Sequence, residues 1–151
     1  MHYSSWALTG RHATRPPLLQ PDPELRVSDV VVDYQDALAS GDVEAIVAVF
    51  EPGGYAREPA GGRYINRGQD GLRAFYEQLF SNGGGIPLEH CAVIDDARAW
   101  ALEYNVVRGK TELPPQAGLG VYVRGRSGKL VAARLYDDVD RPLPRMPEAS
   151  K

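Results

Sequence analysis

The spacing of the apolar residues changes once along the chain, and this change limits the folds that are open to it. In the first half they recur at intervals of three and four residues, which is the spacing of one face of an α-helix. From residue 88 onward the pattern is that of β-strands, and in 99–107 two faces of different character alternate. Helices followed by strands are typical of the α+β class, with the helices packed on one face of a curved antiparallel sheet.

The first half is predicted to hold three helices. The first begins at an N-cap near Ser28 and ends at Gly41, and Asp42 caps the second. Pro52-Gly53-Gly54 is expected to end the second helix, and the third covers 69–80. The faces expected to be buried comprise Val27, Val30, Val31, Tyr34 and Leu38 in the first helix, Val43, Ile46, Val47 and Phe50 in the second, and Leu72, Phe75, Tyr76 and Leu79 in the third.

The remaining segments are predicted to be strands. A short strand that contains Glu58 turns at Gly61-Gly62 and returns over 63–66. Four strands follow, at 88–94, 98–108, 117–124 and 129–138, and "RGRSGK" forms the turn between the last two. A curved sheet covered by three helices encloses a cone, and a cone has a pocket. We expect one folded domain over 27–140, an N-terminal arm or tail over 1–26 and a C-terminal tail over 141–151.

Charge and cysteine content narrow the classes of function. The net charge is −3 and the 17 Lys and Arg residues are scattered, whereas a nucleic-acid-binding protein needs a basic stripe. The single cysteine, Cys91, excludes an internal disulfide and suits a reducing cytoplasm. No apolar run reaches the length of about 18 residues that a membrane span requires. We therefore expect a soluble cytoplasmic protein that binds neither nucleic acid nor membrane.

The segment "EPGGYAREPAGG" (51–62) contains a carboxylate for which two roles are open. Alternation along a strand places Ala56, Glu58 and Ala60 on the same face. Glu58 is then either a solvated acid on an outer face or a base that points into a cavity left open by the two alanines. An apolar cavity would raise the pKa of this carboxyl and make it a better base near neutral pH.

Three stretches of the sequence, "DYQDALASGDVEAIVAVF" (33–50), "AREPAGG" (56–62) and "GLRAFYEQLF" (71–80), carry a family resemblance. They resemble the nuclear transport factor 2-like superfamily, and within it the ketosteroid isomerases and the SnoaL-like polyketide cyclases. The resemblance implies a cystatin-like α+β barrel, shaped as a cone, over residues 27–140. It also implies a small hydrophobic ligand, no cofactor, and a homodimer formed through the face of the sheet.

The same resemblance assigns catalytic roles. Glu58 precedes a proline, as the catalytic acid of the isomerases does, and is the expected proton shuttle. Tyr34 is the expected oxyanion-binding phenol, and Tyr76 is expected to hydrogen-bond to it and hold it in place. Gly120 falls where the isomerases have a protonated acid, so Tyr122 is the only expected donor nearby. Losing one oxyanion donor typically costs about 10²–10³ in turnover.

The strand at 99–107 gives two contrary expectations. Apolarity places Trp100 and Tyr104 inside the protein, whereas the family register turns Ala101, Glu103 and Asn105 into the cone and packs the Trp100 face against a second subunit. With that register, the expected substrate-binding residues are Phe50, Ala60, Phe75, Ala101, Glu103, Asn105, Gly120, Tyr122 and Asp137.

Four functions remain open on the sequence. A cofactor-free isomerase that moves a proton α to a carbonyl is the leading prediction, and a non-catalytic small-molecule-binding domain, which Gly120 favours, is the alternative. The third is an epoxide hydrolase of the limonene-epoxide type, which needs an arginine and two carboxylates around one water. The sequence does not provide this arrangement, because Arg57 and Glu58 lie on opposite faces of a strand. The fourth is a pure interaction domain. No metal site is expected at His90, because its two sequence neighbours, Glu89 and Cys91, point to the opposite face of the strand.

Overall fold

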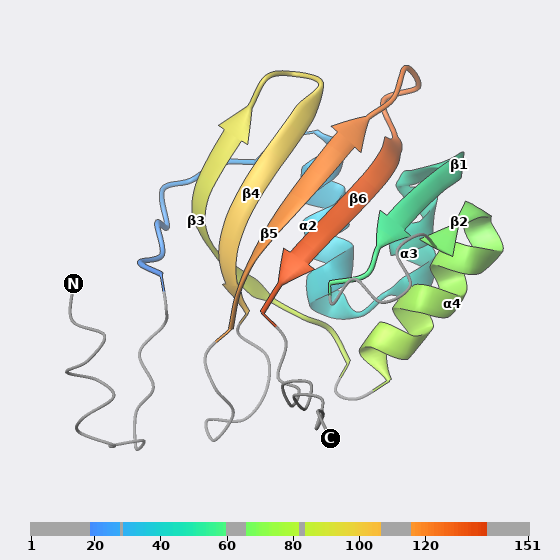
Figure 1. Cartoon of the computed structure of the whole chain (residues 1–151), viewed down its shortest axis with the longest axis horizontal. Coiled ribbons are helices and arrows are strands. Elements are labelled where there is room, and N and C mark those ends of the chain that lie inside the picture. Colours follow the sequence, from blue (N-terminus) through green and yellow to red (C-terminus); the bar gives the residue numbers. More distant parts are fainter. Residues whose placement is uncertain (1–18, 28, 60–65, 82–83, 107–115, 139–151) are drawn as a thin grey trace, which may run out of the picture.

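The first two helices form on either side of the predicted break. In the computed structural model, which describes residues 19–27, 29–59, 66–81, 84–106 and 116–138, α2 covers Val30–Ser40 and α3 covers Val43–Ala48 (Figure 1). Gly41 ends α2 in the left-handed conformation, with φ 75°, which glycine adopts without steric cost. The Asp42 carboxylate accepts a hydrogen bond from the Ala45 N–H at 3.0 Å and caps α3. The break predicted at "SGD" is confirmed.

Some sequence predictions concern residues outside the described ranges. They are the N-cap at Ser28, the lining residue Ala60, the greater part of the returning strand at 63–66, the arm before residue 19 and the tail over 141–151. The described part of the arm lies against the sheet, where the Asp22 N–H donates to the carbonyl of His90 at 2.9 Å.

The third helix, α4, covers Gly68–Phe80 and begins one residue before its predicted start. Its buried side chains are Leu72, Phe75, Tyr76 and Phe80. Leu79, which was expected among them, is only partly buried, and Phe80 occupies the core instead. None of the helices in the described part of the chain is long and apolar enough to cross a membrane.

Four strands form the predicted antiparallel meander. They are β3 (Leu88–Asp95), β4 (Ala99–Val106), β5 (Gln116–Arg124) and β6 (Leu130–Asp137), and each begins and ends within two residues of the prediction. The turn predicted between β5 and β6 is present, with the Gly125 N–H donating to the carbonyl of Lys129 at 2.8 Å.

The strand before Glu58 differs from the prediction. Pro52-Gly53-Gly54 does not end a helix: α3 ends at Ala48, and β1 (Phe50–Arg57) runs through these residues. β1 pairs parallel to β6 and antiparallel to β2 (Asn66–Arg67), which gives the strand order β2-β1-β6-β5-β4-β3. The pairing with β6 changes register between Phe50 and Tyr55, since proline and glycine disturb a regular ladder.

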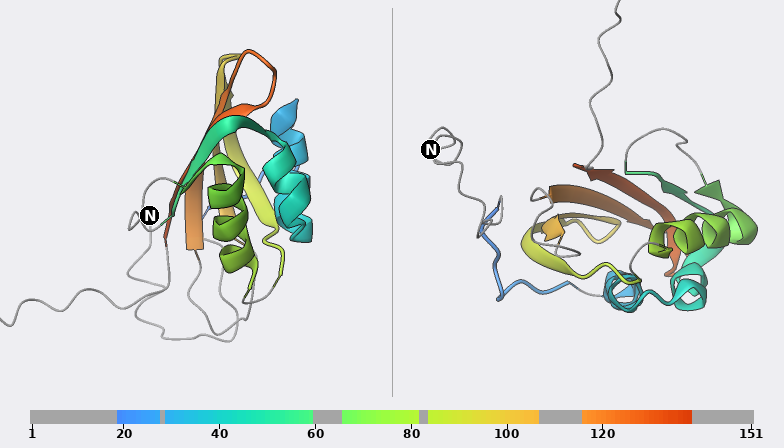
Figure 2. Two further views of the ribbon diagram at one scale, coloured as in Figure 1. Left: turned by 90° about the vertical axis from the view of Figure 1, so that its right-hand side faces the viewer. Right: turned by 90° about the horizontal axis from the view of Figure 1, so that it is seen from below.

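The helices cover one face of the curved sheet, and the core fills the space between them (Figure 2). This arrangement confirms the predicted α+β class. The side chains that are completely buried there come from both layers and include Val31, Tyr34, Ile46, Leu72, Tyr76, Leu102, Tyr122 and Leu130.

β4 shows which of the two contrary expectations is correct. Trp100, Leu102 and Tyr104 are buried in the core, so the prediction from apolarity is confirmed. Ala101 and Glu103 lie on the opposite, outer face, and the prediction that they point into the interior is wrong. The physical reason is that large aromatic side chains release far more free energy on burial than alanine or an unpaired carboxylate.

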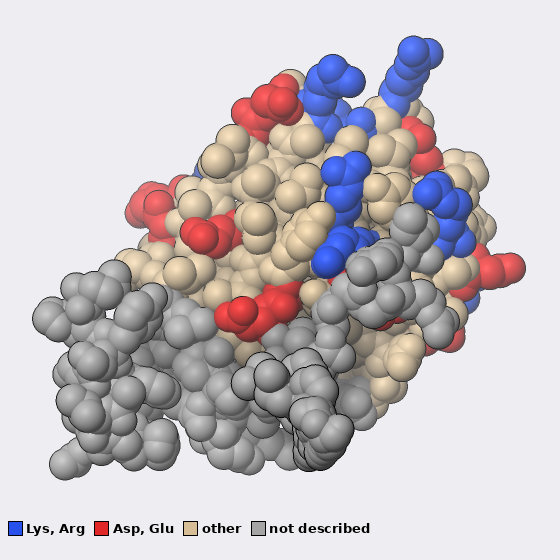
Figure 3. All heavy atoms as spheres, in the orientation of Figure 1, with Lys and Arg blue, Asp and Glu red and all other residues tan. Residues whose placement is uncertain are grey.

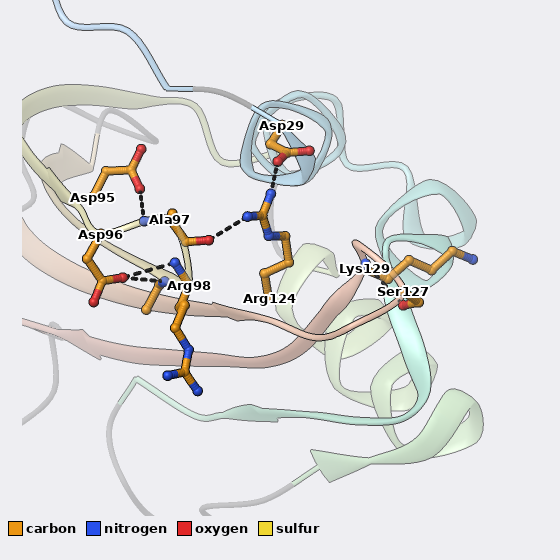
Figure 4. Close-up of polar contacts among 9 residues, drawn as sticks. Asp29, Asp95, Asp96, Ala97, Arg98, Arg124, Ser127 and Lys129 are labelled. Carbon is orange, nitrogen blue, oxygen red and sulfur yellow. Dashed lines mark hydrogen bonds and ion pairs between the residues drawn. The ribbon is translucent and has the colours of Figure 1, made fainter.

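Exposed polar side chains tie together one end of the sheet, which we call the turn end (Asp29, residues 95–98 and residues 124–129). Figure 4 shows the Arg124 guanidinium between the carboxylate of Asp29 and the carbonyl of Ala97, with which it forms an ion pair and a hydrogen bond. Asp29 and Ala97 are the two described non-glycine residues with positive φ, at 65° and 74°. Arg124 thus holds the start of α2 and the β3–β4 turn together.

Charge is unevenly distributed over the outer face of the sheet. In Figure 3 most acidic side chains lie over β3 and β4 and most basic ones over β6 and β1, with a largely uncharged surface between them; an acidic group also lies at the lower ends of β5 and β6, and a basic side chain at the top of β4. On the basic side, the Arg57 guanidinium lies 4.2 Å from the ring of Tyr136, which is 44% exposed. Leu119, directly opposite Tyr136 on β5, is also exposed.

Candidate functional site

Four tyrosine side chains meet between the helices and the sheet. Tyr34 comes from α2, Tyr76 from α4, and Tyr104 and Tyr122 from the inner faces of β4 and β5. Each is at most 2% exposed. Burial raises the pKa of all four phenols, so they keep their protons at neutral pH and are available as hydrogen-bond donors.

Tyr34 and Tyr76 form the pair that the sequence predicted. Their hydroxyl oxygens are 2.7 Å apart, and either can be the donor. The rings meet edge to face, with centroids 6.2 Å apart. One phenol proton is used within the pair and the other remains for a further acceptor. The expected hydrogen bond is present, while the catalytic roles given to the two residues stay predictions.

Asp137 is the last residue of β6 and lies among these phenols. It stands opposite Gly118 of β5, and its Oδ1 accepts a hydrogen bond from the Tyr104 hydroxyl at 2.7 Å. Burial raises the pKa of Asp137 to about 6, although the bond from Tyr104 acts in the opposite direction. A carboxyl group with a pKa near neutrality can both accept and return a proton.

Two glycines on β5 make room for this arrangement. A Cβ at Gly118 would come closer than 3.0 Å to the Asp137 carboxylate and to the ring of Tyr104. A Cβ at Gly120 would come equally close to the ring and hydroxyl of Tyr122, which folds back along its own strand. A larger residue at either position would therefore displace a polar group of the site.

Tyr122 lies at the centre of the cluster. Its ring centroid is 4.9 Å from that of Tyr34, and its hydroxyl accepts a hydrogen bond from the side-chain amide of Gln35 at 3.2 Å. Gln35 follows Tyr34 on α2 and is buried. The helix thus supplies one phenol and the amide that contacts another.

Glu58 and Asp137 differ in their relation to the phenols. Glu58 directly follows β1 and is half-buried. Asp137 interacts electrostatically with Tyr34, Tyr104 and Tyr122 and helps to raise the pKa of each, whereas Glu58 is not among the groups that shift the pKa of these three or of Tyr76. The carboxylate that the structure brings to the tyrosines is therefore Asp137.

The other predicted lining residues fall into three groups. Phe50 and Phe75 are buried beside the tyrosines, with Phe50 6.2 Å from Tyr34 and Phe75 4.7 Å from Tyr76 between ring centroids. Ala101 and Glu103 lie on the outer face. Asn105 is buried but also on the outer side, where its amide accepts from the Leu19 N–H at 3.2 Å and donates to the Leu19 carbonyl at 2.8 Å. Asn105 thus holds the arm.

Sequence reasoning missed three members of the cluster, namely Gln35, Tyr104 and Gly118. The signal for Tyr104 was present in the alternation that also buries Trp100 and Leu102, but the family register overrode it. The signal for Gly118 was its spacing of two from Gly120, which puts both glycines on one strand face. Gln35 gave no signal, because a polar residue on a helix is usually exposed.

Within the described ranges the site holds phenols, one carboxyl group and an amide, and no group of three or more His, Cys, Asp and Glu residues is placed to hold a metal ion. Such a set can donate hydrogen bonds to an oxygen of a ligand and move a proton next to it.

Comparison with known proteins identifies the fold. Several solved structures share it at low identity. A putative polyketide cyclase from Sinorhizobium meliloti is 15% identical with a TM-score of 0.61, over 72% of this chain and 94% of that one. A hypothetical protein with a ketosteroid isomerase-like fold from Catenulispora acidiphila, in complex with trimethylamine, is 10% identical with a TM-score of 0.62, over 74% and 86%. SalBIII, an epoxide hydrolase/cyclase-like enzyme in pyran ring formation in the polyether salinomycin, is 18% identical with a TM-score of 0.59, over 73% and 88%.

No curated protein matches the chain. The family model of the SnoaL-like domain matches residues 31–133. These residues span α2 to the middle of β6 and include Tyr34, Tyr76, Tyr104 and Tyr122. The protein therefore belongs to the SnoaL-like family, within the nuclear transport factor 2-like superfamily.

Proposed function

We propose that this protein is a cofactor-free enzyme that moves a proton at the carbon next to a carbonyl group of a small hydrophobic substrate, with Asp137 as its acid–base residue. One observation carries the proposal: the Asp137 carboxyl, with its pKa raised to about 6, lies among buried phenols and accepts a hydrogen bond from Tyr104. The polyketide cyclase and ketosteroid isomerase-like proteins that share the fold support this class of reaction.

The reaction needs a base, an acid and a donor for the oxygen. The Asp137 carboxylate takes a proton from the carbon α to the carbonyl, and the electron pair of that C–H bond moves into an enolate. A buried phenol of the Tyr34–Tyr76 pair donates to the enolate oxygen with its remaining proton. The protonated Asp137 then returns the proton to the γ carbon of a conjugated enolate, and the double bond has moved by one position. No other reactant is consumed.

Tyr104 positions the carboxylate in this scheme. Its hydroxyl donates to Oδ1 of Asp137, which leaves the second oxygen of the carboxylate for the substrate. Because the bond stabilises the ionised form, it partly offsets the rise in pKa that burial causes. Glu58 is the base expected from the resemblance. A substitution of Glu58 is therefore the control that tests whether Asp137 or Glu58 has the acid–base role.

The direct test is the turnover of a β,γ-unsaturated 3-ketosteroid, followed by the ultraviolet absorbance of the conjugated product. Asp137→Asn should lower the rate about 10²–10⁴-fold, as the loss of a general base does, whereas Glu58→Gln should lower it less than about tenfold. The opposite ranking would assign the proton shuttle to Glu58. Thermal unfolding of each variant shows that the fold is retained.

The alternative function, binding without turnover, is favoured by the burial of the phenols. Tyr34, Tyr76 and Tyr122 are all fully buried in the structure, so a substrate reaches them only if side chains move. Wild-type protein that binds a ketosteroid but does not convert it would support this alternative.

The outer face of the sheet supports a homodimer as the assembly in which this site works. If two copies stack face to face about a two-fold axis that runs parallel to the strands, the acidic β3–β4 side of one copy meets the basic β6–β1 side of the other (Figure 3). The exposed side chain of Leu119 lies on β5, between the two charged sides, and the exposed ring of Tyr136 lies directly opposite it on β6. Sedimentation should show a dimer that weakens with added salt and with Tyr136→Glu; a monomer at all concentrations would contradict it.

A further inference from the structure

The Arg124 side chain closes the turn end of the space between the helices and the sheet. Its guanidinium forms an ion pair with the carboxylate of Asp29 at the start of α2 and donates a hydrogen bond to the carbonyl of Ala97 in the β3–β4 turn (Figure 4). The guanidinium carbon also lies 5.3 Å from the ring centroid of Trp100, which is only 2% exposed. Arg124 thus joins the helices to the sheet and lies over Trp100.

Two of the buried phenols lie directly behind this contact. Tyr122 of β5 stands opposite Trp100 of β4, and the ring of Tyr34 lies against that of Tyr122, with centroids 4.9 Å apart. All three side chains are at most 2% exposed. Because Tyr34 belongs to α2, a movement of the start of α2 away from the β3–β4 turn would uncover Trp100 first and then this pair of phenols.

The closed arrangement has three local costs. Asp29 and Ala97, the two residues that Arg124 binds, have positive φ angles, which are strained in a residue with a Cβ. The indole N–H of Trp100 is buried and has no acceptor in the described part of the chain, which is destabilising. Asp29 is the N-cap of α2, but its carboxylate makes no capping hydrogen bond. Each of these costs can be relieved once the Arg124 contacts break, so a local alternative competes with the closed state.

The Asp29 carboxylate has an alternative partner in the helix that it precedes. Aspartate at an N-cap normally accepts from N–H groups of the first helical turn, and Asp42 does so at the start of α3, with an extended backbone of φ −90°. The ion pair with Arg124 occupies the Asp29 carboxylate, and the φ angle of Asp29 has the opposite sign, at 65°. Rotation of Asp29 to the conformation of Asp42 would exchange the ion pair for a cap.

We propose that Asp29 and Arg124 form a latch with two states, and that opening of this latch admits ligands to the interior at the turn end. In the closed state the Asp29 carboxylate pairs with Arg124. In the open state it caps α2, and the start of α2 moves away from Trp100. The proposal rests on the proposed function in taking the buried phenols as the ligand site, and it adds the route by which a ligand reaches them. Neither latch residue contacts the bound ligand, so the latch controls rates rather than affinity.

Acrylamide quenching of Trp100 fluorescence measures the opening of the latch. The chain has two tryptophans, so Trp6→Phe leaves Trp100 as the only one, and every variant carries this substitution. Arg124→Met removes the ion pair but keeps an apolar side chain over Trp100; it should raise the quenching rate constant about twofold to fivefold, because the loss of a partly exposed ion pair shifts an equilibrium by this factor. Arg126→Met is the matched control, since Arg126 is exposed in the β5–β6 turn. Equal quenching in the two variants would overturn the proposal.

Two substitutions at Asp29 test whether the open state is the capped one. Asp29→Ser and Asp29→Ala both remove the ion pair and both place a Cβ at the same positive φ, but only serine can cap α2. The quenching rate constant should therefore be about fivefold higher in Asp29→Ser than in Asp29→Ala, the usual effect of one N-cap. Thermal unfolding shows that both variants are folded. Equal quenching in the two would show that Asp29 has no second partner, and would overturn the two-state latch.

Stopped-flow binding of 2-naphthol, a small fluorescent aromatic probe, tests whether ligands enter through the latch. Arg124→Met should raise the association and dissociation rate constants by the same factor of about two to five, and should change Kd by less than about twofold. An association rate constant that is unchanged in Arg124→Met would place the entrance elsewhere and overturn the proposal. Wild-type protein that does not bind the probe would also overturn it.

The latch and the proposed function fail separately. Asp137→Asn should remove turnover but leave the association rate constant of 2-naphthol within about twofold of wild type, because Asp137 lies at the opposite end of the sheet from the latch. Turnover that depends on Asp137, with an association rate constant that does not respond to Arg124→Met, would leave the function standing and overturn the latch. An association rate constant that responds to Arg124→Met in a protein without turnover would support the latch and overturn the function.

Discussion

The two ends of the sheet treat polar side chains in opposite ways. At the turn end, Asp96 is exposed, and its carboxylate accepts hydrogen bonds from the backbone N–H groups of Ala99 and Arg98 at 2.9 and 3.0 Å. These bonds lower the pKa of Asp96. At the opposite end, which we call the Asp137 end, burial raises the pKa of Asp137 to about 6.

This difference separates a carboxylate whose pKa is lowered by backbone hydrogen bonds from one whose pKa is raised by burial. At the turn end, backbone N–H groups satisfy the Asp96 carboxylate, so it stays ionised and holds the β3–β4 turn in place. At the Asp137 end, polar side chains form hydrogen bonds with one another, and their removal from water lowers the stability of the fold. Such a cost is typical of functional sites.

The largest effect on this comparison is expected from Gly118→Ala. The added methyl group would overlap the Asp137 carboxylate and the Tyr104 ring, which should lower the free energy of unfolding by about 1–3 kcal/mol, as overpacking does, and should also reduce turnover. Chemical denaturation measures the change. Gly53→Ala is the matched control: it lies in β1 with nothing within 4 Å of its Cβ, and should change stability by less than about 0.5 kcal/mol. Equal effects of the two substitutions would show that side chains around Gly118 pack no more closely than those around Gly53 of β1.

The next effect is the pH dependence that Asp137 gives to stability. Its pKa is raised to about 6 from an ordinary value of 3.8, so the folded protein binds a proton more tightly than the unfolded chain between these values. The stabilisation from the neutral carboxyl is complete below the lower value and is lost as the pH rises through the higher one. The stability of wild type relative to Asp137→Asn should therefore fall by about 1–3 kcal/mol between pH 4 and 7. A stability difference between wild type and Asp137→Asn that does not change with pH would show that the Asp137 carboxyl is solvated.

The smallest effect is expected from Asp96, and it has the opposite sign. Because the pKa of Asp96 is lowered, its contribution to stability is present at neutral pH and is lost as the pH falls through the ordinary range of a carboxyl group. The stability of wild type relative to Asp96→Asn should thus rise slightly with pH. Denaturation at several pH values measures both variants in one series. A difference of the same sign for Asp96 and Asp137 would remove the contrast between the two ends.

The sequence predicted the helices and strands better than it predicted which side chains point toward the site. Each strand of the meander could be placed from its pattern and its turns, and "SGD" marked the helix break, because these signals are local. Helical spacing predicted that Tyr34 and Tyr76 are buried, and the family resemblance predicted the contact between them. Pro52-Gly53-Gly54 was misread because proline and glycine end a helix and also tolerate an irregular strand at a register shift.

The surroundings of Asp137 were harder to predict because they depend on contacts between distant segments. A carboxylate at the end of a strand is usually exposed, and only the pairing of Asp137 with Gly118, with Tyr104 beside it, shows that this one is partly buried and hydrogen-bonded. Ala101 and Glu103 were placed inward by a register borrowed from relatives. The burial of Trp100 and Tyr104 decides the orientation of β4, and it was legible in the sequence.

The parallel pairing of β1 with β6 has a consequence for how the protein folds. The meander β3–β6 joins strands that are neighbours in the chain, whereas the contact between Arg57 and Leu135 spans 78 residues. Closing so long a loop costs entropy that only later contacts repay, so we expect the meander to form first and β1 to dock last. Tyr34 lies on α2, which precedes β1 in the chain, so we expect it to meet the tyrosines of the sheet only when β1 docks. The buried tyrosine cluster would then be the last part of the molecule to be completed.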